Sequence, residues 1–455
     1  MRKTVVLNVV GLTRQLLAHM PAMRRFADDA TVATINHVMP AVTCSVQATY
    51  LTGKLPSQHG IVGNGWYDRE DCEIKFWKQS DKLVQSPRIW EIARQRDRSF
   101  TCANLFWWYA MYSTCDVTVT PRPMYPADGR KIPDLWTNPP ELRQELQHAL
   151  GTFPLFKFWG PAAGLDSSEW IINAAGTLET RFRPTLTLVY IPHLDYVLQR
   201  VGPDPVQIRD DLERLDALLN RLVRHYEDSA TRIVILSEYG IEPVDRPVHL
   251  NRFLRAQNLL TIREELGGEL LDAGASKAFA VADHQVAHVY VNDPSKLDEV
   301  ERIVRAAPGV QHVLRGEAIS AAGMDHARCG DLVAVAEPGA WFTYYYWLED
   351  ARAPDFARTV DIHRKPGYDP VELFLDPRKR FIHARIGWKL LKRKLGFRAL
   401  LDVIPLDANL VRGSHGRPPA SENVAPIFIT RQRDLVGQRL NPTDVRDALL
   451  RHVFD

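Results

Sequence analysis

The segment 40–53, with the sequence PAVTCSVQATYLTG, places a hydroxyl where a helix is expected to begin. That hydroxyl belongs to Thr43, in the predicted first turn of the helix. The partial positive charge at a helix N-terminus lowers the cost of a negative oxygen and favours an incoming phosphate. A threonine hydroxyl attacks poorly unless a base or a metal ion activates it, so such chemistry needs further groups. The alternative interpretation is that Thr43 only caps the helix.

The elements that would position such groups are predicted strands separated by helical patterns. Three short β-branched runs are expected to be core strands: Val5–Val10, Thr187–Ile191 and Ile233–Leu236. A helical pattern at 206–225 and others like it separate these runs, which indicates an α/β fold with a mostly parallel sheet and helices on both faces. Ligands of such sheets bind beyond the carboxyl ends of the strands. Residues 192–199 and 237–240, which follow two of the strands, are therefore candidates for a site.

A longer motif extends from the Thr43 segment to residue 64. Residues 40–64 follow the pattern P-x-x-T and then T-G-x-x-P-x-x-H-G-I-x-G-N. This motif resembles the nucleotide pyrophosphatase/phosphodiesterase branch of the alkaline-phosphatase superfamily, including its phosphonoacetate-hydrolase-like members. The resemblance implies an alkaline-phosphatase-like fold in which Thr43 is the nucleophile. It also implies that Asn64 and the backbone N–H of Cys44 contact a phosphoryl oxygen.

The family that the chain resembles binds two zinc ions, and part of that ligand set is retained. The resemblance assigns Asp195 and His415 as metal ligands, and it puts Glu238 where the family has an aspartate ligand. A two-metal site would activate the threonine hydroxyl and clamp the phosphoryl group. The resemblance therefore implies one or two divalent metal ions as cofactor.

Three other ligand positions of the family are changed in this chain. Val10 stands at the place of an aspartate ligand and cannot bind a metal. Gln199 replaces a histidine and is a poor zinc ligand, and Tyr239 replaces another histidine, where it would face the substrate. Because the remaining donors are mostly oxygens, Mg²⁺, Mn²⁺ or Ca²⁺ would suit them at least as well as zinc.

A polar segment outside these motifs, 360–370, offers groups that would rebuild the site. Asp361 and His363 would point the same way in an extended chain and would form a ligand pair. Arg364 and Lys365 would hold a phosphate, since arginine binds it bidentately and lysine acts as a point charge. The alternative is a polar loop with internal salt bridges. The segment 282–285, which holds an Asp-His pair, is expected to be a turn.

The chain is expected to form one core interrupted by two insertions. The core comprises 1–65, 171–265 and 331–455, with a cap or lid at 66–170 and a small α+β insertion at 266–330. The aromatic residues expected to line the lid are Trp66, Tyr67, Phe106, Trp107, Trp108 and Tyr109. Such a lid favours a phosphorylated substrate with an apolar or aromatic group, for which a lipid or prenyl diphosphate is one candidate.

The segment 381–397 combines basic and apolar residues at helical spacing. A basic amphipathic helix can lie on an anionic membrane surface or face an acidic ligand. The alternative is a helix that packs its apolar face on the core and leaves its charges in water.

Composition bears on the binding partners and the cellular location of the protein. The 57 basic and 55 acidic residues leave a net charge of +2, which gives no support for a nucleic-acid-binding protein. No apolar run approaches the roughly 20 residues that span a bilayer. Five irregularly spaced cysteines are typical of a reducing compartment. With no signal-peptide pattern in the first residues, a cytoplasmic location is expected.

Together these features predict a metal-dependent hydrolase of a phosphate ester, phosphodiester or pyrophosphate that acts through Thr43. One alternative is a non-catalytic protein that binds a small molecule or a partner on a degenerate phosphodiesterase scaffold. Another is transfer of the phosphoryl group to an acceptor other than water.

Overall fold

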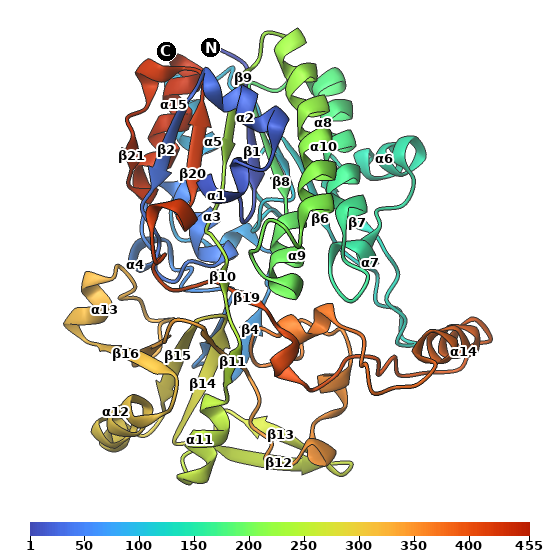
Figure 1. The fold of residues 1–455 in the computed structure, drawn as a ribbon, viewed down its shortest axis with the longest axis vertical. Coiled ribbons are helices and arrows are strands. Elements are labelled where there is room, and N and C mark those ends of the chain that lie inside the picture. Colours follow the sequence, from blue (N-terminus) through green and yellow to red (C-terminus); the bar gives the residue numbers. More distant parts are fainter.

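The computed structural model describes residues 1–455, and its largest element is a nine-stranded sheet (Figure 1). In spatial order the strands are β21 (Arg439–Leu440), β2 (Thr31–Ile35), β20 (Ile427–Thr430), β9 (Arg232–Leu236), β1 (Thr4–Val9), β8 (Leu186–Ile191), β5 (Cys102–Leu105), β6 (Val117–Pro121) and β7 (Leu135–Asn138).

The centre of this sheet is parallel and fully buried. Strand β1 pairs in parallel with β8 on one side and with β9 on the other, so that Val6 lies between Leu188 and Val234. All six residues of β1 and of β8 are buried, as expected for strands that read as nearly continuous apolar runs. The three predicted core strands and the predicted α/β class, with a mostly parallel sheet, are confirmed.

The helices of this part pack in two groups. Helix α10 (Arg209–Asp228) contacts α2 (Pro21–Asp28) and α8 (Leu165–Phe182), and α15 (Val445–Phe454) contacts α3 (Thr43–Thr52) and α5 (Ile89–Arg96). The other helices of this part are α1 (Arg14–Leu17), α4 (Pro56–His59), α6 (Leu142–Leu150), α7 (Leu155–Phe158) and α9 (His193–Val201). A continuous cluster of 75 buried apolar residues joins these helices to the sheet and forms the main core.

A second part of the molecule has its own sheet and its own core (Figure 1). Its antiparallel sheet has the order β14 (Ala278–Asp283), β15 (Val286–Val291), β17 (Leu332–Ala336) and β16 (Val310–Arg315). The helices of this part are α11 (Leu250–Ala256), α12 (Leu297–Ala306), α13 (Glu317–Ala321) and α14 (Ile382–Lys394). Two hairpins are also present: β3 (Gly65–Asp68) with β4 (Glu73–Phe76), and β12 (Thr261–Glu265) with β13 (Gly268–Asp272).

Short strand pairs lie where the chain runs between the two parts. Strand β10 (Glu242–Pro243) pairs with β19 (Gly413–Ser414), and β11 (Arg246–Val248) pairs with β18 (Ala340–Phe342). Because residues 413–414 directly precede His415, the first of these pairs holds that histidine at the junction of the two parts.

The segment 66–170 does not form a separate cap as a whole. Strands β5, β6 and β7 come from it and extend the main sheet beyond β8. Of the six aromatic residues expected to line a lid, only Trp108 is partly exposed, because the other five are buried in the hydrophobic clusters of the fold. The domain boundaries at 65, 170, 265 and 330 stay a prediction.

Two further observations concern membrane spanning and the state of the cysteines. None of the helices has the length and apolar composition needed to span a bilayer. All five cysteines are free, and four of them are buried.

Candidate active site

The candidate residues gather at the carboxyl ends of the central strands. Thr43 is the first residue of α3, Asp195 lies in the first turn of α9 just after β8, and Glu238 and Tyr239 follow β9. All four side chains are buried. The edge of the sheet that topology favours for ligand binding thus carries the predicted residues.

Thr43 and Asp195 are joined through a tyrosine. The Thr43 Oγ1 and Tyr239 Oη atoms lie 2.9 Å apart, and Tyr239 Oη donates to Asp195 Oδ1 at 3.2 Å. A phenol has one hydrogen to donate, so Thr43 donates its own hydrogen to the phenol oxygen. The three groups therefore form a chain of hydrogen bonds that leads from the threonine hydroxyl to a carboxylate.

The other oxygen of Asp195 is also bound. Gln199 Nε2 donates to Asp195 Oδ2 at 2.8 Å, and Tyr368 Oη donates to Gln199 Oε1 at 2.9 Å. Burial raises the pKa of Asp195 to about 7, and the hydrogen bonds from Tyr239 and Gln199 limit the rise. The carboxyl group is thus set to exchange a proton near neutral pH.

Asn64 is held next to the start of α3 by an aspartate. The backbone N–H of Cys44 donates to Asn64 Oδ1 at 3.0 Å. The Asn64 backbone N–H and Nδ2 donate to the two oxygens of Asp283, at 2.8 and 3.0 Å. Because Nδ2 carries two hydrogens, one of them remains for another acceptor. Burial raises the pKa of Asp283 to about 6, and its hydrogen bonds with Asn64 oppose that rise.

Glu238 binds two amides in the interior. Asn8 Nδ2 and Gln47 Nε2 each donate to Glu238 Oε1 at 2.6 Å, while Oε2 has no hydrogen-bond partner. Burial raises the pKa of Glu238 to about 8. A carboxyl group in this setting is largely protonated at neutral pH, which removes the cost of a buried charge.

His415 belongs to a stack of four rings. The centroids of Tyr239 and His415 lie 3.6 Å apart, those of His415 and His284 3.8 Å, and those of His284 and Tyr368 3.6 Å. His415 Nδ1 donates to the carbonyl of Ala41 at 2.8 Å, which leaves Nε2 without a hydrogen. This Nε2 has no hydrogen-bond partner and lies 3.7 Å from Asp195 Oδ1. Burial holds the pKa of His415 well below its usual range, so the ring is neutral.

The donor set does not fit the two-zinc centre that the resemblance implies. Val10 is fully buried and apolar, and the side chains of Gln199 and Tyr239 are occupied by hydrogen bonds within the protein. No three His, Cys, Asp or Glu side chains are grouped so that they would hold a metal ion. Asp195 and His415 alone fall short of the three or four protein ligands of a zinc site.

The 360–370 segment does not rebuild that centre. Lys365 is buried and forms ion pairs of 2.7 Å with Asp369 and with Glu372, so it is not free to hold a phosphate. Arg364 points to Asp355, at 3.1 Å, and stacks over Phe356. The alternative of a polar loop with internal salt bridges describes these two residues correctly.

The predicted ligand pair is likewise not assembled into a metal site. His363 Nδ1 lies 3.3 Å from the carbonyl of Phe76, and the Asp361 carboxylate has no hydrogen-bond partner among the side chains. Burial raises the pKa of Asp361 and lowers that of His363. Neither residue hydrogen-bonds to Asp195 or to His415.

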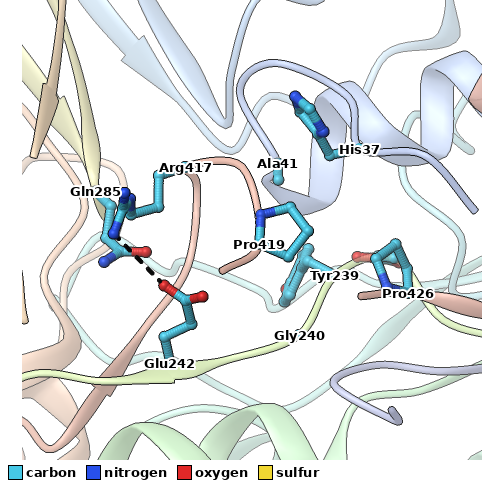
Figure 2. Close-up of a pocket in the computed structure, with 10 residues that line it drawn as sticks. His37, Ala41, Tyr239, Gly240, Glu242, Gln285, Arg417, Pro419 and Pro426 are labelled. Carbon is cyan, nitrogen blue, oxygen red and sulfur yellow. Dashed lines mark ion pairs between the residues drawn. The ribbon is translucent and has the colours of Figure 1, made fainter. Parts of the chain in front are cut away.

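A small pocket adjoins the hydrogen-bonded chain (Figure 2). It is lined by His37, Ala41, Glu238, Tyr239, Gly240, Glu242, Gln285, Arg417, Pro419 and Pro426. Arg417 and Glu242 face each other within it at 3.9 Å. Thr43 and Asp195 are not part of its wall, so the pocket reaches Tyr239 without opening onto the threonine hydroxyl.

Comparison with known proteins identifies the family. The sequence profile of the Type I phosphodiesterase / nucleotide pyrophosphatase family matches residues 4–369, which is most of the chain. The chain belongs to this family of hydrolases. A relative in this family, an uncharacterized pyrophosphatase/phosphodiesterase of Schizosaccharomyces pombe, is 23% identical over 231 residues. That match spans 49% of this chain and 40% of the length of the relative.

Solved structures of the family's branch share the fold over nearly the whole chain. Murine ectonucleotide pyrophosphatase / phosphodiesterase 5 is 16% identical, with a TM-score of 0.59, and the match covers 99% of this chain and 95% of that one. Phosphonoacetate hydrolase from Sinorhizobium meliloti, in complex with phosphonoformate, is 14% identical, with a TM-score of 0.62 and coverage of 99% and 96%. At these identities the likeness concerns the fold.

Several residues of the site were not found by pattern. Asn8 lies on a buried strand and Gln47 on a fully buried helix. A buried polar side chain requires a hydrogen-bond partner, and this requirement was the only sequence signal that they belong to a polar site. The predicted turn follows β14 at His284, and both His284 and Asp283, the last residue of β14, reach into the site. Tyr368 gave no signal, since only the fold brings it to Gln199.

Proposed function

We propose that this chain is a phosphoester hydrolase in which Thr43 is the nucleophile and Asp195 is the base. The observation that carries the proposal is the hydrogen-bonded chain from Thr43 through Tyr239 to Asp195. A base within hydrogen-bond reach, directly or through one intervening group, is what a weak hydroxyl nucleophile requires.

The reaction proceeds in two steps. The Thr43 Oγ1–phosphorus bond forms while the bond from phosphorus to the leaving oxygen breaks, and the threonine proton passes to Tyr239 as the tyrosine proton passes to Asp195. Water then attacks the phosphorus, breaks the bond to Thr43 and releases the product. The Thr43 oxygen takes back the one proton held on Asp195, by way of Tyr239. The proton that the attacking water loses passes to solvent, and the leaving oxygen takes a proton from solvent, so the protons balance over the cycle.

Charge on the phosphoryl oxygens is balanced by groups at the start of α3. The spare hydrogen of Asn64 Nδ2 and the N-terminal end of the ten-residue helix α3 would face these oxygens. Asp283 fixes the Asn64 amide in place, so no reorganisation is needed when the negative charge develops.

This mechanism contains no step through a metal ion, although the family centre is a two-zinc site. The reason is the chemistry of the donors: a valine, an amide and a phenol stand at three ligand positions, and the latter two are hydrogen-bonded within the protein.

The neighbours and the rings around the site support a proposal for the substrate class. A structure of the murine protein described as inactive, after a single threonine-to-alanine change, is in complex with AMP, and the bacterial hydrolase is in complex with phosphonoacetate. Here the partly exposed Trp77 lies 5.2 Å from the Trp108 ring and 6.1 Å from Tyr368. A phosphorylated small molecule with an apolar or aromatic group fits these surroundings. The cytoplasmic location stays a prediction.

A second candidate function is binding without turnover, and the altered ligand positions favour it. The experiment that separates the two uses bis(p-nitrophenyl) phosphate and p-nitrophenyl phosphate as probes, with Thr43→Ala and the control Thr180→Ala, which changes an exposed threonine of α8. The hydrolase predicts loss of nitrophenol release in Thr43→Ala alone. Binding without turnover predicts no release by the wild type, while AMP still shifts its melting temperature.

A further inference from the structure

The segment 377–401 carries an extreme charge distribution. It holds nine lysines and arginines and no aspartate or glutamate within 25 residues. Helix α14 forms its centre and projects from the side of the molecule, apart from the other helices (Figure 1). A chain with a net charge of only +2 therefore concentrates its positive charge on this one element.

One side of α14 fastens the helix to the molecule. Ile382 and Ile386 are half-buried against the second core. Lys389 pairs with Asp402, and Arg393 Nε donates to the carbonyl of Ala399 at 2.8 Å. These four α14 residues recur every three or four positions and so share one face.

The opposite side of α14 exposes large apolar side chains. Trp388, Leu391 and Leu395 are 58%, 45% and 65% exposed, and their spacing places them on the face turned away from the molecule. Phe381 and Phe397, at the two ends, are 80% and 66% exposed. The expectation that the helix packs its apolar face on the core is therefore wrong for this face, which nothing in the chain covers.

The exposed apolar strip is flanked by cations without carboxylate partners. Arg385 and Lys392 lie on one side of the strip and Lys394 on the other, and none of them forms an ion pair. Next to this helix, Arg398 donates to the carbonyl of Ala127 at 2.7 Å. That bond holds a loop in which Met124 and Tyr125 are also exposed.

We propose that α14 is an interfacial helix that docks the protein on an anionic lipid surface. A bilayer boundary takes up tryptophan and leucine side chains and its headgroups attract lysine and arginine, so it matches both features at once. Nucleic acid would match the charges but would leave the apolar strip in water. Docking does not depend on the chemistry at Thr43.

The segment that leads into α14 contacts the surroundings of the site. Glu372, ten residues before α14 begins, accepts from Trp159 Nε1 at 2.5 Å. The Trp159 ring lies 5.7 Å from that of Tyr368, which binds Gln199. The segment that precedes α14 thus packs against aromatic residues that contact the site.

The test is co-sedimentation of the full chain with vesicles of phosphatidylcholine, alone or mixed with phosphatidylglycerol. We expect binding to the mixed vesicles only, weakened when the ionic strength is raised to about 1 M, where the Debye length is about 3 Å. Arg385→Gln with Lys392→Gln should weaken partition by about fivefold for each residue changed. Trp388→Ser with Leu391→Ser should weaken it at least as much.

The matched control is Phe156→Ser, a 55% exposed apolar residue on α7. It should bind like the wild type, and all variants should keep the wild-type melting temperature. Equal binding to both vesicle types, no binding to either, or binding unchanged by Trp388→Ser with Leu391→Ser would overturn the proposal. Retention of duplex DNA that needs the basic residues but not Trp388 and Leu391 would also overturn it.

Discussion

Replacing Tyr239 with phenylalanine removes one oxygen atom and tests the proposed mechanism most directly. The phenol oxygen joins Thr43, at 2.9 Å, to Asp195, at 3.2 Å, and without it no group links the nucleophile to its base. The phenylalanine ring keeps the stacking on His415. Assistance by a general base is worth about 10²–10⁴-fold in rate. We therefore expect kcat to fall by about that factor, with little change in KM.

The assay is release of nitrophenol from bis(p-nitrophenyl) phosphate, at a pH above the Asp195 pKa of about 7. Loss of a hydrogen bond to a charged group also costs about 1.5–3 kcal/mol of stability, so unfolding must be measured in parallel. The matched control is Tyr226→Phe, which removes a buried phenol oxygen that has no partner and lies on α10. A Tyr239→Phe enzyme with wild-type kcat, beside an inactive Thr43→Ala, would show that Asp195 does not act through the tyrosine.

Three further predictions follow from the same site. Because the base must be ionised, kcat/KM should rise as the pH increases through about 7 and level off above it, and Asp195→Asn should abolish the rise. Glu238→Gln should keep kcat/KM within a few-fold of the wild type, because the amide retains an oxygen that accepts from Asn8 and Gln47. Glu238→Ala should lose about 1–3 kcal/mol of folding stability. A large loss of activity in the glutamine variant would point to a charged role for Glu238. Protein dialysed against EDTA should contain less than one zinc per chain by elemental mass spectrometry and stay active, and activity restored only by added metal would contradict the mechanism.

The same pKa values fix how stability depends on pH. The folded-state pKa values of Asp195 and Glu238, about 7 and about 8, lie above their ordinary values, so the folded state holds more protons than the unfolded state between about pH 4 and 8. The stability that these groups contribute is fully present below about pH 4, declines as the pH rises from there, and is lost above about pH 8. Thermal unfolding of Glu238→Gln should show a shallower decline, since the amide does not ionise.

The fold was predictable because its central elements have strong local signals. Strands β1, β8 and β9 are apolar and β-branched, and buried parallel strands must read that way. The place of the segment 66–170 in the fold was harder to predict, because aromatic residues indicate that a segment is buried but not which core buries it. Its strands β5, β6 and β7 are only four or five residues long, so they give little periodicity.

The site was predictable only where one residue or one short motif carries the signal. Thr43 and Asn64 lie in a single motif, and Asp195 and Glu238 follow predicted strands. Contacts between residues that are distant in the sequence leave no such signal in it. Lys365 is different, because its acidic partners Asp369 and Glu372 follow it closely in the sequence, and the alternative of a polar loop with internal salt bridges allowed for such pairs. The stack formed by His415, His284 and Tyr368 joins residues from three distant segments.

The changes at the ligand positions have one physical consequence in common. Two zinc ions would neutralise the buried carboxyl groups of Asp195 and Glu238, and without that charge a buried carboxylate is costly. Here Asp195 receives hydrogen bonds from Gln199 and Tyr239, the residues that stand in place of two histidines. Glu238 receives them from Asn8 and Gln47, and the pKa values of both carboxyl groups rise toward neutrality. Protons and amides thus take over the charge compensation that metal ions provide in the family centre. In the proposed mechanism, a carboxyl group that accepts a proton near pH 7 is the base for the threonine hydroxyl.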